Sequence, residues 1–118
     1  MMELDYSARA VAKYVHISPQ KIRLVLDQVR GKGAEEALAI LRFMPQRAAR
    51  PVAKLIRSAA ANADDRYGLG LDELYIAQIY ADDGPRMRRF RFGARGRFKP
   101  RLRRAAHITV VLGLREVL

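Results

Sequence analysis

The segment from Gly84 to His107 (GPRMRRFRFGARGRFKPRLRRAAH) contains nine arginines, one lysine and no carboxylate. A guanidinium group donates a fork of hydrogen bonds to phosphate oxygens and also stacks on nucleobases. The residue types of this segment, called the basic arm below, therefore indicate binding of a polyanion. Its cations are Arg86, Arg88, Arg89, Arg91, Arg95, Arg97, Lys99, Arg101, Arg103 and Arg104.

Almost all of the net charge lies in the basic arm. The chain has 23 Lys and Arg against 12 Asp and Glu, a net charge of +11, and removing the ten cations of the arm leaves 13 against 12. A nearly neutral body thus carries a cationic arm, which repels itself and should become ordered against a polyanion. With a pI near 10.9, nucleic acid is the leading partner and an anionic membrane surface the second.

Three phenylalanines, Phe90, Phe92 and Phe98, alternate with the cations of the arm. Two interpretations remain open: the rings stack on exposed bases, or they join the two legs of a hairpin as cross-strand pairs. Both describe an arm that contacts backbone phosphates, because no element of the chain is patterned to read a base sequence.

Residue types that catalyse reactions are scarce. The absence of cysteine excludes a disulfide framework, a thiolate metal site and a cysteine nucleophile. His16 precedes a helix, where a capping or loop role is expected, and His107 opens a strand, where a hydrogen bond or an RNA contact is expected. Asp64-Asp65 and Asp82-Asp83 have the pattern of solvated turn carboxylates. With no P-loop or zinc spacing, we expect no enzyme, cofactor, metal site or small-molecule substrate.

Two segments that flank the arm are predicted to be strands. Residues 73–81 (ELYIAQIYA) are apolar on both faces, which predicts a central strand, and residues 107–114 (HITVVLGL) are rich in β-branched residues. The arm between them then forms one protruding β-hairpin, with its turn near 93–96. Roughly ten residues per leg, at about 3.3 Å each, give a reach of some 30–35 Å.

The remaining segments predict a strand and a helix at the start of the body. Residues 4–14 (LDYSARAVAKY) alternate as a strand, with Arg9 and Lys13 on its charged face. That face serves solubility or makes a second phosphate contact, and both interpretations remain open. A helix is predicted to begin with Ser18 as its N-cap and Pro19 in the first helical position.

This first helix is predicted to end at Gly31 and Gly33, because glycine accepts a positive φ. A second helix is predicted over 34–43 and a third over about 47–64, followed by an exposed turn over 64–70. The turn is expected to contain the aspartate pair and the following glycines.

The chain length of 118 residues suits one domain. We expect a single domain over 1–118, with a globular body of 1–83 and 108–118 and an extended hairpin of 84–107. No apolar run resembles a signal peptide or is long enough to span a bilayer, so a soluble, unprocessed protein is expected.

Five motifs in matching order and spacing give the chain a resemblance to the bacterial ribosomal protein L twenty-two family of the large subunit, over nearly the full length. The motifs are ISPQKIRLVLDQVRGK (17–32), SAAANA (58–63), DDGPRMRR (82–89), ARGR (94–97) and HITVVLG (107–113).

The resemblance implies an α+β fold, with three helices packed on a small three-stranded antiparallel sheet and a long protruding basic β-hairpin. It implies a structural constituent of the large ribosomal subunit, a ribonucleoprotein component of translation that binds ribosomal RNA (rRNA) from several domains and supports assembly. The body would lie near the tunnel exit beside neighbouring large-subunit ribosomal proteins. The hairpin would line the nascent-peptide exit tunnel, with its tip near the macrolide site. The location would be cytoplasmic, with no membrane partner.

Residue by residue, the resemblance assigns RNA contact to three groups of positions. They are Arg88, Arg89, Arg95 and Arg97 on the way to the tip; Arg103, Arg104 and His107 at the strand return; and Lys21 and Arg23 on the body. As further basic residues of the hairpin, Arg86, Arg91, Lys99 and Arg101 are also expected to contact RNA. The tunnel-lining tip consists of Phe92, Gly93, Ala94, Arg95, Gly96 and Arg97.

The chain departs from the family pattern at two places. Phe92-Gly93 replaces a Pro-Arg pair that is common before the tip, which leaves the tip conformation open. Ala105-Ala106 replaces a Thr-Ser pair, which removes two hydroxyl donors that would have met phosphate.

Two alternative functions stand beside the ribosomal one. A free nucleic-acid-binding architectural protein that uses a basic β-arm would be a folded dimer that protects DNA. Binding to a membrane surface would require the phenylalanines to share one face.

Overall fold

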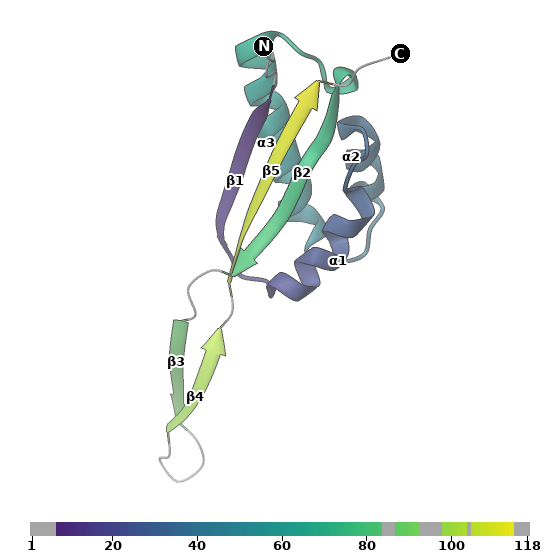
Figure 1. The fold of residues 1–118 in the computed structure, drawn as a ribbon. Helices are drawn as coiled ribbons and strands as arrows, with labels where there is room; N and C mark the ends of the chain where they lie inside the picture. The colour runs from purple at the N-terminus through teal and green to yellow at the C-terminus, as the bar shows by residue number, and fades with distance from the viewer. Residues whose placement is uncertain (1–6, 84–86, 93–97, 104, 115–118) are drawn as a thin grey trace.

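The computed structural model describes residues 7–83, 87–92, 98–103 and 105–114 (Figure 1). Within these residues, three α-helices cover one face of a three-stranded antiparallel sheet, and two more strands form a separate pair. The predicted α+β class is therefore confirmed. In chain order the elements are β1 (Ala8–Val15), α1 (Pro19–Val29), α2 (Ala34–Arg42), α3 (Ala49–Tyr67), the short 3-10 helix η1 (Leu71–Glu73), β2 (Leu74–Asp83), β3 (Met87–Phe92), β4 (Phe98–Arg103) and β5 (Ala106–Leu114).

The three-stranded sheet has the order β1-β5-β2, so β5 is its central strand and β2 lies at an edge. The prediction of a central position for β2 is wrong. The prediction rested on apolar residues on both faces, and a β-bulge in the strand accounts for that pattern. The register of β2 against β5 slips between Ile76 and Gln78. The slip turns Ile79 toward the helices, on the same side as Ile76. Tyr75 and Tyr80 are left on the other face, 37% and 38% exposed.

The hydrophobic core lies between the sheet and the helices. Alternate residues of β5 enter it, and the buried residues of α1, which recur at helical spacing, meet them. Burying a side chain of this size stabilises the fold by about 1.5–3 kcal/mol. Fully buried core residues include Ile22, Leu26, Val52, Ile56, Ile76, Ile108, Val110 and Leu112.

The start of α1 agrees with its prediction in full, and its end agrees in part. Ser18 Oγ accepts a hydrogen bond of 3.4 Å from the backbone N–H of Lys21, and a proline follows as the first helical residue. Gly31 has a φ of +78°, in the left-handed region. Gly33 does not: its φ is −59°, and it precedes α2 and forms a bridge with β2. The expectation of a positive φ at Gly33 is therefore wrong.

The second and third helices are also present. α2 ends one residue before its predicted end at 43, and α3 runs three residues beyond its predicted end at 64. Asp64 and Asp65 thus lie, exposed, in the last turns of α3 and not in a turn as predicted. The helix continues until Gly68, whose φ of +65° ends it, because glycine adopts this conformation without a steric penalty.

A ribbon formed by β3 and β4 projects beyond the end of the sheet (Figure 1). β2 and β5 pair as far as Asp83 and Ala106, and β3 and β4 pair antiparallel along their whole length. This arrangement agrees with the predicted hairpin. The intervening residues 84–86, 93–97 and 104 lie outside the described part.

Candidate nucleic-acid interface

The β3–β4 ribbon places cations directly opposite one another. Arg89 is the partner of Arg101, and Arg91 is the partner of Lys99. Like charges at opposed positions destabilise an antiparallel pair of strands, so the ribbon favours a bound polyanion that neutralises them. The predicted contact residues on these strands are Arg88, Arg89, Arg91, Lys99, Arg101 and Arg103.

The three phenylalanines of the arm lie on β3 and β4. Phe92, at the end of β3, is the register partner of Phe98, and Phe90 is the partner of Pro100. This register is the one that cross-strand pairing of Phe92 with Phe98 requires, and base stacking stays a prediction. The predicted site residues outside the described part are Arg86, Gly93, Ala94, Arg95, Gly96, Arg97 and Arg104.

Arg23, a predicted RNA contact, has a structural role as well. Its Nη2 donates a hydrogen bond of 2.9 Å to the backbone oxygen of Ala81 in β2. Arg30 donates in the same way to Ile79, at 3.1 Å, and its Nη1 lies 2.6 Å from Asp27. Two guanidinium groups therefore fasten α1 to β2. Sequence reasoning missed this role, although the seven-residue spacing of the arginines places them on one helix face.

The outer edge of β2 is closed by these contacts and by a neighbouring loop. Beyond the two arginine contacts, the backbone N–H of Ile76 donates to Lys32 at 2.9 Å, and Gly33 bridges Tyr75. A strand edge whose N–H and C=O groups are occupied does not recruit another strand. The three-stranded sheet is thus protected on this side from pairing with a second copy.

Lys21 lies at the rim of a hollow between the start of α1 and the loop before α3. The hollow has a volume of about 420 Å³ and is also lined by His16, Leu24 and Arg47, with no carboxylate among its lining residues. Two exposed cations at one hollow form a surface suited to phosphate. RNA contact by Lys21 stays a prediction, and Arg47 is a neighbour that sequence reasoning did not single out.

His107 lies at the base of the ribbon and accepts a hydrogen bond. Its Nδ1 accepts the backbone N–H of Tyr14 at 3.1 Å, and the two rings meet edge to face with centroids 5.0 Å apart. The expected hydrogen bond is therefore confirmed. Because Nδ1 is occupied as an acceptor, the neutral ring carries its proton on Nε2, and RNA contact by His107 stays a prediction.

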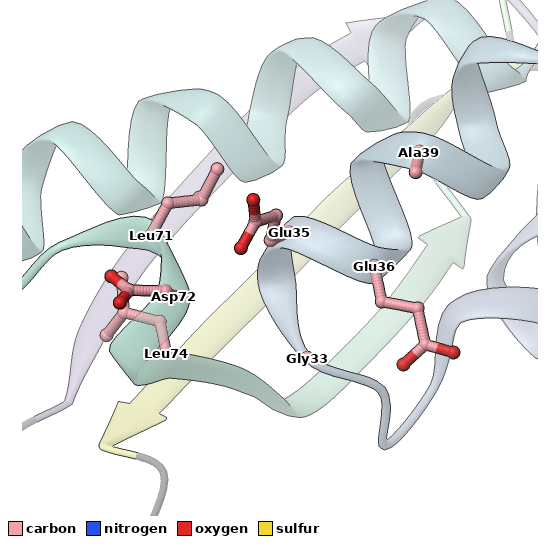
Figure 2. A pocket seen from close by; sticks show the side chains of 7 residues that line it. All are labelled: Gly33, Glu35, Glu36, Ala39, Leu71, Asp72 and Leu74. Atoms are coloured by element: carbon pink, nitrogen blue, oxygen red, sulfur yellow. The ribbon is translucent and has the colours of Figure 1, made fainter.

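A second hollow, of about 300 Å³, lies between α2 and η1 and is acidic (Figure 2). Glu35, Glu36 and Asp72 line it, with Glu35 on the side of Leu71 and Asp72 and Glu36 turned away from them. The two glutamates occupy the first turn of α2, where the helix dipole favours anions. Because carboxylates repel phosphate, this acidic end is not a candidate for the nucleic-acid interface.

Two features are absent from the described residues. Among them, no group of three or more His, Asp or Glu side chains is arranged to hold a metal ion. Over the same part of the chain, no helix combines the length and the apolar character needed to cross a membrane.

A small α+β body that carries a ribbon of opposed cations has the features expected of a protein that binds the backbone of nucleic acid. The comparison with known families makes this class specific. Residues 10–113 match the family of ribosomal protein L22p/L17e, and the chain belongs to that family.

Curated relatives match this chain over most of its length. Large ribosomal subunit protein uL22 of Thermoanaerobacter sp. (strain X514) is 50% identical over 109 residues, covering 92% of this chain and 98% of the relative. The protein of the same name from Clostridium novyi (strain NT) is 49% identical over 105 residues, covering 89% and 95%. That of Thermomicrobium roseum is 50% identical over 104 residues, covering 88% of each.

Proposed function

We propose that this chain is a structural constituent of the large ribosomal subunit, where it binds rRNA and supports assembly. The observation that carries the proposal is the β3–β4 ribbon, whose opposed cations favour a bound polyanion. The family, and relatives named as large-subunit proteins, support rRNA as that polyanion. This role is structural and needs no catalytic residue or cofactor.

The proposed RNA contacts form two regions. The arm supplies its ten cations, and the body supplies Lys21, with Arg47 beside it at the same hollow. Arg23 contributes only the N–H groups that its bond to Ala81 leaves free. His107 contributes through Nε2.

The hairpin tip, Phe92 to Arg97, is proposed to line the nascent-peptide exit tunnel. Its legs would contact rRNA from several domains, and the tip would contact the passing peptide. The body would meet neighbouring large-subunit proteins. The location is the cytoplasm, within the large subunit, as the bacterial relatives support.

Sedimentation of ribosomes from the source cells tests this proposal. We expect the tagged full chain to remain with the large subunit across a salt series, because many phosphate contacts act together. A variant lacking 86–104 should dissociate at lower salt. Sedimentation of the full chain with DNA or membranes, or its release at modest salt, would contradict the proposal. A stable dimer on DNA would instead support the free architectural protein.

A further inference from the structure

The sheet face turned away from the helices, called the open face below, is not covered by any described element (Figure 1). Rows of residues cross it from β1 through β5 to β2. One row contains Val11, Thr109 and Tyr80, and the row beside it contains Arg9, Val111 and Gln78. The open face is therefore a continuous surface formed by three strands.

Two tyrosines of β2 lie on the open face. Tyr75 and Tyr80 are 37% and 38% exposed. The ring of Tyr75 extends over Gly113 of β5, because a Cβ added at Gly113 would lie 2.9 Å from Cε1 of that ring. Within the described residues, neither tyrosine hydroxyl has a hydrogen-bond partner. The open face thus presents aromatic rings in a position fixed by the sheet.

Two cations lie on the opposite edge of the same face. Arg9 and Lys13 of β1 are exposed, and within the described residues their side chains form no ion pair. They are two strand spacings from the tyrosines, roughly 10 Å. Two residues of β5, which lies between them, expose little side chain: Thr109 is only 4% exposed, and Gly113 has none. Asp82, the carboxylate on the described part of this face, lies at its hairpin end, opposite His107.

We propose that the open face is a second RNA-binding surface, which takes an unpaired segment of rRNA. Tyr75 and Tyr80 stack on bases, and Arg9 and Lys13 hold phosphates. Sheets that display aromatic rings bind single-stranded RNA in this way, because every base offers a ring face and unpaired bases are free to stack.

Charge and position favour RNA over a protein partner. A protein interface would bury apolar surface and leave Arg9 and Lys13 desolvated, whereas phosphate pairs with both. The open face also continues into the arm, since β2 leads to β3 and β4 leads to β5. This inference rests on the proposed function, because the arm is what brings rRNA to these strands.

Site-specific crosslinking in assembled subunits tests the inference. The photoreactive residue 4-azidophenylalanine replaces Tyr75 or Tyr80 in the full chain, and purified large subunits are irradiated. Phe90 in the arm receives the same group as a positive control. Phe43, which is 83% exposed at the end of α2, receives it as a matched aromatic away from the open face.

We expect crosslinks to RNA from positions 75, 80 and 90. RNA crosslinks from position 90 together with protein crosslinks, or none, from 75 and 80 would overturn the inference and leave the proposed function intact. A chain that does not enter large subunits would refute the proposed function itself.

Affinity for protein-free large-subunit rRNA gives a second measurement. Tyr75→Ala and Tyr80→Ala should each weaken binding at least about fivefold without changing the salt slope. Tyr75→Phe and Tyr80→Phe, which keep the ring, should leave the affinity unchanged. Arg9→Gln with Lys13→Gln should reduce the slope by about 1.4, the value for two phosphates of a single strand. Unchanged affinity in the alanine variants, with normal circular dichroism, would overturn the inference.

Discussion

The backbone N–H of Tyr14 donates a 3.1 Å hydrogen bond to Nδ1 of His107, which lies 93 residues further along the chain. The bond joins the end of β1 to the start of β5, where the ribbon leaves the body. Tyr14 has a φ of +58°, a left-handed conformation that is unfavourable for a non-glycine residue. The contact with His107 therefore holds an unfavourable backbone conformation at the base of the hairpin.

His107→Ala should reduce the free energy of unfolding by about 0.5–1.5 kcal/mol, because it removes the acceptor of the Tyr14 N–H. Urea denaturation at constant pH measures this change. His16→Ala is the control, since His16 is exposed and forms no hydrogen bond within the described residues; it should change stability by less than about 0.5 kcal/mol. Equal losses in the two variants would contradict a structural role for His107.

Arg23→Met with Arg30→Met should expose the outer edge of β2. The backbone oxygens of Ala81 and Ile79 would lose their donors, at a cost of about 0.5–1.5 kcal/mol each. The uncovered edge should also promote association between copies. Urea denaturation and light scattering of the free chain measure the two effects.

Arg57→Met is the matched control for this double variant. Arg57 is exposed on α3, and its side chain donates no hydrogen bond in the described part of the chain. It should leave both stability and association unchanged. If the double variant behaves like this control, the arginines do not protect the edge.

Leu26→Ala should reduce the free energy of unfolding by about 2–5 kcal/mol, because Leu26 is fully buried between α1 and the sheet. Leu24→Ala, two residues away on the same helix, removes the same atoms from a side chain that is 64% exposed. It should cost less than about 0.5 kcal/mol beyond the small change in helix propensity. Thermal unfolding of both variants checks the predicted arrangement of α1.

Arg91→Gln with Lys99→Gln should lower the salt slope of rRNA binding by about 1.4–1.8 if both cations contact phosphate. The two residues are register partners, so the substitution also removes a like-charge pair. The free chain should then become slightly more stable while its RNA affinity falls. Filter binding across a salt series measures the slope, and an unchanged slope would exclude both residues as phosphate contacts.

Local signals predicted much of the fold. Ser18 and Pro19 located the start of α1, and the charge contrast between the arm and its β-rich flanks located the ribbon. The α2 helix was predicted over 34–43 and is present over Ala34–Arg42. In each case a few neighbouring residues determine the structure.

The sequence-based predictions failed where contacts between residues far apart in the chain determine the structure. In β2, one extra residue near Ala77 changes which side chains face the core, and apolar residues on both faces concealed that bulge. The hydrogen bonds of Arg23 depend on a strand 58 residues away. Within the candidate site, charge composition indicated the ribbon. The open face emerged only from the order of the strands, because Arg9 and Tyr80 share a surface through β5.

The order β1-β5-β2 has a consequence for folding during synthesis. β5 is the last of the described elements to be made, and both other strands of the sheet pair only with it. The sheet therefore cannot form until the whole cationic arm has been synthesised. Until then β1 and β2 stay unpaired, and the apolar faces that pack between helices and sheet stay exposed. A nascent chain that has not reached β5 has no completed sheet, so the body can finish folding only after the arm has been synthesised.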